Sequence, residues 1–261
     1  MMKAINTLDN NALTTKAKWE AIWAGVKLPF VNEPGDDMKE QLETYLPHNG
    51  LYSFIEIGCA PGGWMAYFNK HFGYRVAGLE YAEAAAKATQ LNMKLLAIDA
   101  EVFVQDFFSI DCTKSKYDIV FSAGFIEHFR DPLPVMDRIV ALSQRYVVTI
   151  VPNLFGVNGC IGKTIQSKVY AEHIQIDVSA LSGLHVSCGL KTLFCDYAGG
   201  ARLIAPGAHN EFFNKHRYCA RIVNTPAGVF NRLSTYVGAF LHYIPRSRLL
   251  SDSLLYIGLK E

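Results

Sequence analysis

A glycine-rich turn lies between two apolar runs in the stretch Phe54-Ile55-Glu56-Ile57-Gly58-Cys59-Ala60-Pro61-Gly62-Gly63-Trp64. The first run ends in an acid, and the second begins at Trp64 with the spacing of an opening helix. The pattern predicts a strand, a tight loop and a helix. Because Gly58 and Gly62 lack Cβ atoms, the backbone can press closely on a ligand while its N–H groups face outward. Such a loop favours a polar, extended ligand such as a nucleoside, although an ordinary strand-to-helix turn has the same outline.

Two acids favour the nucleoside over the ordinary turn. Glu80 ends a second apolar run, roughly twenty residues after the loop, where an acid is expected to accept both ribose hydroxyls of a nucleoside laid across two parallel strands. Glu56 stands before the first glycine, in the pattern E-x-G-x-A-x-G-G. Dinucleotide folds usually carry G-x-G-x-x-G with an apolar residue at that point.

This pattern resembles motif I of the Rossmann-like, class I S-adenosylmethionine-dependent methyltransferases, with Ala60 where many members carry the middle glycine. The resemblance implies that the loop approaches the methionine part of the cofactor and that Glu56 orients the loop and the ammonium group. Glu80 would take the ribose hydroxyls. The cofactor-binding residues that the resemblance implies are Glu56, Gly58, Cys59, Ala60, Pro61, Gly62, Glu80, Tyr81, Asp106, Phe107, Ala123 and Phe125.

Three of these residues have specific expected roles around the adenine ring of the cofactor. Tyr81 would lie against the adenine ring, and Asp106 would accept a hydrogen bond from the adenine amino group with Phe107 beside the ring. The alternative for Asp106 is an Asx turn at a strand end.

A second segment, Ser122-Ala123-Gly124-Phe125-Ile126-Glu127-His128-Phe129-Arg130-Asp131-Pro132, resembles the LEHxxDP segment of small-molecule methyltransferases of the ubiquinone-biosynthesis type. The resemblance implies that backbone carbonyls near Ala123 face the ammonium group and that His128 lies near the transferred methyl. An imidazole there can take a proton from an attacking hydroxyl, so His128 is the expected catalytic residue. A structural histidine below the site is the alternative.

The composition is that of a globular chain, with 261 residues, 50% hydrophobic and 19% charged, and a net charge of +1. The lack of a basic excess disfavours a nucleic-acid partner. The six cysteines form no CxxC pair and no metal-ligand cluster, so we expect reduced thiols, no metal and a cytoplasmic location. No apolar signal core opens the chain, and polar residues interrupt the apolar stretch 227–244, so no transmembrane segment is expected.

Alternating strand and helix patterns predict an α/β fold with a mostly parallel sheet, and the resemblance implies a Rossmann-like sheet of seven strands flanked by helices, with an antiparallel last strand. The expected strands are 52–56, 74–80, 94–97, 117–122, 146–151, 190–197 and 253–260, and the expected helices are 64–71, 82–92, 132–143 and 162–184.

Two regions lie outside this pattern. Residues 1–49 are predicted to form an N-terminal helical cap, and residues 50–261 the methyltransferase domain, with an insertion at 198–251 before the last strand. For Trp19 and Trp23 of the cap, packing on the core is favoured over contact with ligands. The insertion has an aromatic amphipathic stretch at 228–243, which suits a substrate lid, a dimer surface, a membrane-peripheral face or simple packing.

Three other functions remain open at this stage. The loop also resembles that of RNA ribose 2′-O-methyltransferases of the heat-shock rRNA type, but two residues of their Lys-Asp-Lys-Glu tetrad are missing. An NAD(P)-dependent oxidoreductase would share the loop and the ribose acid, and a catalytically silent cofactor-binding subunit would share the whole pattern. We therefore expect a methyltransferase that uses S-adenosyl-L-methionine to modify a small-molecule, saccharide or lipid-linked acceptor, favouring oxygen because of His128. The oligomeric state is left open.

Overall fold

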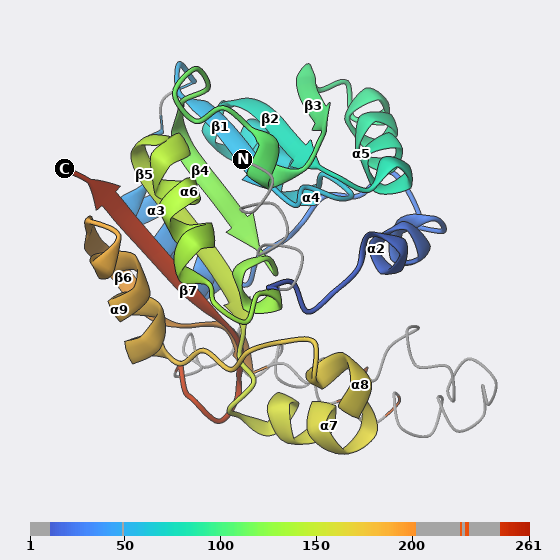
Figure 1. Ribbon diagram of the computed structural model, residues 1–261, viewed down its shortest axis with the longest axis vertical. Coiled ribbons are helices and arrows are strands. Elements are labelled where there is room, and N and C mark those ends of the chain that lie inside the picture. Colours follow the sequence, from blue (N-terminus) through green and yellow to red (C-terminus); the bar gives the residue numbers. More distant parts are fainter. Residues whose placement is uncertain (1–10, 49, 202–224, 226–227, 230–245) are drawn as a thin grey trace.

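The computed structural model describes residues 11–48, 50–201, 225, 228–229 and 246–261. Within them, seven strands form one sheet in the order β3-β2-β1-β4-β5-β7-β6. Neighbouring strands are parallel except where β7 pairs with β5 and β6. The predicted Rossmann-like α/β fold, with a seven-stranded, mostly parallel sheet flanked by helices, is confirmed (Figure 1).

The strands and helices alternate along most of the chain. The strands are β1 (Ser53–Ile57), β2 (Arg75–Glu80), β3 (Ala100–Val104), β4 (Tyr117–Ala123), β5 (Ser143–Pro152), β6 (Leu190–Ala201) and β7 (Ser251–Lys260). The helices are α2 (Lys16–Trp23), α3 (Asp36–Tyr45), α4 (Gly63–Phe72), α5 (Glu83–Leu95), α6 (Leu133–Leu142), α7 (Val157–Ile165), α8 (Ser167–Tyr170) and α9 (Val178–Ser187), with short 3-10 helices η1 (Phe107–Ser109) and η2 (Ile126–His128).

Both faces of the sheet are buried. Consecutive residues of a strand point to opposite faces, so Phe54 and Ile55 of β1 belong to two different apolar clusters. The first cluster includes residues of α3, α4 and α5, among them Phe68. The second includes residues of α6 and α9, among them Ile139 and Leu181. This double burial explains why the central strands read as continuous apolar runs.

The predicted third strand at 94–97 is wrong. Helix α5 continues to Leu95, and Ala97 turns the chain with a φ of 54°. The N–H of Ile98 donates to the carbonyl of Met93 at 3.0 Å, which closes the helix end. The strand β3 follows at Ala100–Val104, so Asp106 still comes directly after strand three.

The single helix predicted at 162–184 is also wrong, because the chain forms α7, α8 and α9. A new helix starts at α9 because the side chain of Asp177 accepts a hydrogen bond from the N–H of Ala180 at 2.8 Å. The segment between α8 and α9 instead pairs with η2, through a 2.8 Å hydrogen bond from the N–H of Ile174 to the carbonyl of Glu127.

The ends of the predicted insertion 198–251 belong to strands, because β6 runs to Ala201 and β7 starts at Ser251. Most of its aromatic stretch 228–243 lies outside the described residues. In the described part of the chain, no helix has the length and apolar character needed to cross a membrane.

The two N-terminal helices occupy different places. α3 packs on β6 and buries Met38 and Leu42 in the first apolar cluster. α2 lies beside α5, away from the sheet (Figure 1). It buries no residue fully. The tryptophans of α2 therefore do not belong to either core cluster.

Candidate active site

A cavity of about 960 Å³ opens where β1, β2 and β4 end. Ligands of open parallel sheets bind beyond the carboxyl ends of the strands, so the position is the expected one. The wall comes from the loops after these strands and after β3, from α2 and α6, and from the segments after β5 and α8. The lining residues that the argument uses below are Trp19, Gly58, Ala60, Glu80, Tyr81, Asp106, Phe107, Ala123, Phe125, Glu127, His128, Arg138 and His173.

The loop after β1 presents its backbone to this cavity. Gly58 has a φ of 70°, and a Cβ there would lie 3.3 Å from the ring of Phe125. Its N–H donates to the carbonyl of Leu79 at 2.9 Å, which ties the loop to the end of β2. Only glycine suits this combination of left-handed backbone and close ring. The glycine predicted to approach a ligand is thus required by the local backbone.

Glu56 lies beneath the loop, outside the cavity lining. Its carboxylate is buried and accepts a hydrogen bond from the N–H of Met65, at the start of α4, at 3.2 Å. Burial raises the pKa of Glu56 well above its usual value. In this position the side chain joins the first strand to the helix that follows the loop.

Glu80 sits in the cavity wall with 6% of its surface exposed. Its Oε1 accepts from the N–H of Ala82 at 2.9 Å. Burial raises the pKa of Glu80, and hydrogen bonds from the backbone of Ala82, Tyr81 and Ala60 partly oppose that rise. The carboxylate is therefore held against the turn between β2 and α5 and against the glycine-rich loop.

Asp106 and Phe107 form the next part of the wall, after β3. Asp106 caps η1 by accepting from the N–H of Phe108 at 2.9 Å, which is the Asx turn considered as an alternative for this residue. Arg138 of α6 donates to the carbonyls of Phe107 and Ile110, at 3.3 and 2.6 Å. The guanidinium group of Arg138 thus holds the backbone of η1 and the residue that follows it.

Glu20 of helix α2 binds the start of helix α5, beside the cavity. Its two carboxylate oxygens accept from the N–H groups of Glu83 and Ala84, each at 2.7 Å. The N-cap residue of α5, Ala82, has no side chain that can do this. Glu20 thus supplies from another helix the cap that α5 lacks, and it places Trp19 and Trp23 on the cavity wall.

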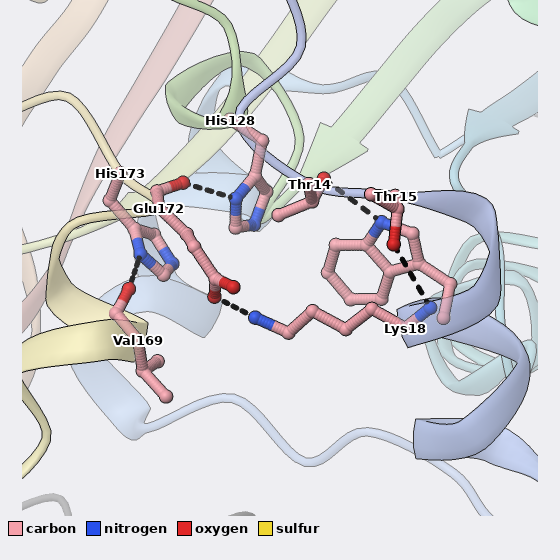
Figure 2. A network of polar contacts seen from close by, with 8 residues as sticks. Thr14, Thr15, Lys18, His128, Val169, Glu172 and His173 are labelled. Atoms are coloured by element: carbon pink, nitrogen blue, oxygen red, sulfur yellow. Dashed lines mark hydrogen bonds and ion pairs between the residues drawn. The ribbon is translucent and has the colours of Figure 1, made fainter.

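A cluster of three ionisable side chains lies at the other end of the wall. Figure 2 shows the imidazoles of His128 and His173 beside each other, and their ring centroids are 4.3 Å apart. Nδ1 of His128 lies 2.9 Å from the carbonyl of Glu172, and Nδ1 of His173 lies 2.7 Å from the carbonyl of Val169 (Figure 2). Glu127 adjoins both and is 1% exposed.

Burial dominates the electrostatics of this cluster. It lowers the pKa of His128 to about 3, with the charges of His173 and Lys18 adding to the effect. It lowers the pKa of His173 as well and raises the pKa of Glu127 to about 8. At neutral pH both imidazoles are therefore uncharged.

The structure brings most of the expected site residues to one cavity. Gly58, Ala60, Glu80, Tyr81, Asp106, Phe107, Ala123, Phe125 and His128 line it. Glu56, Cys59, Pro61 and Gly62 do not line it. Cys59 is fully buried, and Gly62 is the N-cap residue before α4, with a φ of 86°. Cys59, Pro61 and Gly62 thus belong to the part of the loop that faces away from the cavity, and Glu56 lies beneath it.

Several lining residues were not found from the sequence. Trp19 and Trp23 were assigned to core packing, but they are half-buried and face the cavity. The spacing correctly placed both tryptophans on one face of the helix, but this face lines the cavity and does not pack on the core. His173 and Arg138 carried no local signal, since tertiary packing alone brings them to the site. Other lining residues that the sequence did not indicate include Thr14, Gln105, Phe108, Glu127, Asp252 and Ser253.

Comparison with known proteins agrees with this architecture. A model of the methyltransferase domain family matches residues 54–144. No curated protein matches the sequence.

Solved methyltransferase structures share the fold. Magnesium protoporphyrin IX methyltransferase from Synechocystis PCC 6803, with bound S-adenosylhomocysteine, has a TM-score of 0.52 and 12% identity, over 94% of this chain and 83% of that one. Phosphoethanolamine N-methyltransferase 2 from Haemonchus contortus has a TM-score of 0.56 and 15% identity, over 94% of this chain and 57% of that one. A methyltransferase from Archaeoglobus fulgidus has a TM-score of 0.53 and 18% identity, over 85% and 93%. At these identities the likeness establishes the fold only.

Proposed function

Through the domain at residues 54–144 the chain belongs to the class I S-adenosylmethionine-dependent methyltransferases, and we propose that it methylates an oxygen of a small-molecule, saccharide or lipid-linked acceptor. One observation carries the proposal. The residues expected to hold the cofactor and the histidine expected to act on the acceptor line the same cavity of about 960 Å³. Ligand pockets span about 300–1,000 Å³, so this cavity is large enough for two small ligands side by side.

The residues present fit the cofactor. Gly58 offers backbone without a Cβ, and Glu80 offers a buried carboxylate in the cavity wall for two neighbouring hydroxyls. Tyr81, Phe107 and Phe125 supply aromatic surface for a planar base. When bound, S-adenosylmethionine supplies an electrophilic methyl group. The remaining work of the protein is to align the acceptor and to receive its proton, and alignment alone can lower a barrier by several kcal/mol.

His128 is proposed to receive that proton. Because its Nδ1 faces the carbonyl of Glu172, the lone pair of Nε2 is the part of the ring left to accept a hydrogen bond from an acceptor hydroxyl. A pKa of about 3 makes this imidazole a weak base. The proton therefore moves only as the acceptor oxygen gains positive charge, and His128 mainly orients the hydroxyl until then.

Methyl transfer is tested with S-adenosylmethionine labelled on the methyl carbon. Purified protein is incubated separately with pools of polar metabolites, saccharides and extracted lipids, and labelled products are identified by mass spectrometry. The proposal expects the label in an alkali-stable O-methyl ether. Label on nitrogen or carbon would refute the oxygen assignment, and cofactor binding without transfer to any pool would indicate a silent subunit.

The role of His128 is tested with the same assay once the product is known. His128→Ala should keep its affinity for S-adenosylhomocysteine but lose about 10²–10⁴-fold in turnover, the usual contribution of a positioned proton acceptor. His48→Ala, at an exposed position, is the matched control. Unchanged turnover of His128→Ala would remove its role.

A further inference from the structure

We propose that Glu127, His128 and His173 bind one divalent transition-metal ion of the Zn²⁺ class on the acceptor side of the cavity. Each side chain offers one ligand atom, and these atoms lie within 4.8 Å of one another. Ligands of a tetrahedral zinc ion, bound at 2.0–2.1 Å, lie about 3.3 Å apart. Small side-chain rotations would close the site around an ion.

The two imidazoles already have the arrangement that metal ligands use. Both Nδ1 atoms face backbone carbonyls, of Glu172 for His128 and of Val169 for His173 (Figure 2). The Nδ1–H groups donate to these carbonyls, so both Nε2 atoms carry lone pairs. Histidines that bind metals in proteins are usually oriented by such a bond from the second nitrogen.

A purely structural histidine in the same protein looks different. Nδ1 of His185 faces the carbonyl of Leu181 at 2.7 Å, and its Nε2 lies 2.8 Å from the hydroxyl of Thr149. Both ring nitrogens of His185 therefore have partners. Among the described residues, His128 and His173 have hydrogen bonds at Nδ1 alone.

The buried side chain of Glu127 supports an ion site independently of the two histidines. It is 1% exposed, and its Oε2 has no hydrogen-bond partner within the described chain. A buried polar group without a partner is costly and usually indicates an ion or a water that completes the site. A cation between Glu127 and the two imidazoles would satisfy this oxygen.

The backbone holds the three ligands in place. Glu127 and His128 are consecutive in η2, and the segment that carries His173 pairs with them through the bond from the N–H of Ile174 to the carbonyl of Glu127 at 2.8 Å. The carbonyl that faces His128 belongs to Glu172, directly before His173. The distance between the two parts of the cluster is thus fixed before an ion arrives.

One nearby cation opposes binding, but it is paired. The ammonium group of Lys18 forms an ion pair with the carboxylate of Glu172 (Figure 2). Once an ion has displaced the proton of Glu127, the carboxylates of Glu127 and Glu172 and the ammonium group of Lys18 leave one net negative charge around the site. Two nitrogens and one carboxylate oxygen suit Zn²⁺ and the neighbouring divalent ions.

The consequence for the acceptor rests on the proposed function. Three protein ligands leave at least one position of the ion open, as in catalytic zinc sites. The open position suits an acceptor with a coordinating oxygen, and coordination would lower the pKa of a hydroxyl there. In the loaded protein Nε2 of His128 would bind the ion, so the acceptor hydroxyl would release its proton to solvent; His128 receives the proton only in the metal-free protein.

The sequence led us to expect no metal, and the proposed site replaces that expectation. That expectation rested on the cysteines, and His173 stands too far along the chain from Glu127 and His128 to form a recognisable motif.

The test uses the full chain, treated with EDTA and dialysed, and titrated with Co²⁺ and with Zn²⁺. We expect one ion per chain by calorimetry and visible absorption bands from the Co²⁺ form. Glu127→Gln and His173→Ala should each lose more than the roughly 10–100-fold in affinity that removal of an outer-sphere partner costs. His71→Ala removes an exposed histidine and should bind as the wild type does.

Affinity for S-adenosylhomocysteine and the far-ultraviolet circular dichroism of each variant show that it is folded. Failure of the wild type to bind an ion one to one, or equal affinity in Glu127→Gln, would overturn the site. A protein that binds S-adenosylhomocysteine but no ion refutes this site alone. A protein that binds the ion but not S-adenosylhomocysteine refutes the proposed function instead.

Discussion

The indole of Trp19 meets the imidazole of His128 edge-on, with ring centroids 5.2 Å apart and an angle of 80° between the planes. Trp19 comes from α2, outside the sheet, whereas His128 follows β4. The Nε1–H of Trp19 donates to the hydroxyl of Thr14 at 3.1 Å, which fixes the ring from the other side. This contact joins the N-terminal helix to the end of the cavity where we propose that the acceptor binds.

Replacing Trp19 by alanine should therefore weaken binding of the acceptor and spare the cofactor. An aromatic pair contributes about 0.5–1.5 kcal/mol beyond its buried area, so we expect the KM for the acceptor to rise up to about tenfold. Trp19→Phe keeps an aromatic ring and should stay closer to the wild type. Steady-state kinetics with the identified acceptor measure the effect. A loss of affinity for S-adenosylhomocysteine of similar size would contradict the position of Trp19 at the acceptor end of the cavity.

Glu20→Ala should destabilise the protein, because it removes the hydrogen bonds to the N–H groups of Glu83 and Ala84. Loss of a helix cap costs about 0.5–2 kcal/mol. Urea denaturation measures this change. Glu43→Ala is the matched control, since the exposed ion pair of Glu43 with Lys39, at 3.9 Å, should contribute less than about 0.5 kcal/mol. Equal effects of the two substitutions would show that Glu20 does not cap α5.

The contribution of His185 to the stability of the metal-free protein should fall as the pH drops from about 6.5 to about 4. Burial lowers the pKa of His185 from 6.5 to about 4, so in this range the unfolded chain binds a proton that the folded protein does not. The contribution is fully present above pH 6.5 and reaches about 3 kcal/mol. Chemical denaturation across this range measures the slope.

His185→Gln supplies the comparison for that slope. The pH dependence of the variant should differ from that of the wild type by the contribution of His185. The remainder combines His128 and His173, whose pKa values are lowered too, with Glu127, whose raised pKa acts in the opposite direction. An identical slope in wild type and variant would contradict a buried, neutral His185.

The sequence predicts the strand-loop-helix unit correctly because local chemistry determines it. Gly58 needs a left-handed backbone, and Glu80 ends a run that is apolar on both faces. The third strand was misplaced because Leu95 and Leu96 continue an apolar run that is equally compatible with a helix end. Nothing in the run itself shows that the chain turns at Ala97.

The acceptor side could not be predicted in the same way. His173 reaches the cavity because the segment before α9 leaves the helix to pair with η2, and this pairing depends on residues far apart in sequence. Trp19 was recognised as part of an apolar face, but the sequence could not show that the face lies over a cavity and not over the core. The division of the chain at residue 50 and the functions of the individual site residues stay predictions.

Binding of S-adenosylhomocysteine to Glu80→Ala tests the central claim most directly. The carboxylate of Glu80 would hold the ribose hydroxyls by charge-assisted hydrogen bonds, so calorimetry should show affinity weakened by about 1–3 kcal/mol. Glu83→Ala removes a neighbouring acid whose side chain is 67% exposed, and it should bind like the wild type. If Glu80→Ala binds S-adenosylhomocysteine as tightly as the wild type does, the cofactor does not lie across β1 and β2, and the account is contradicted.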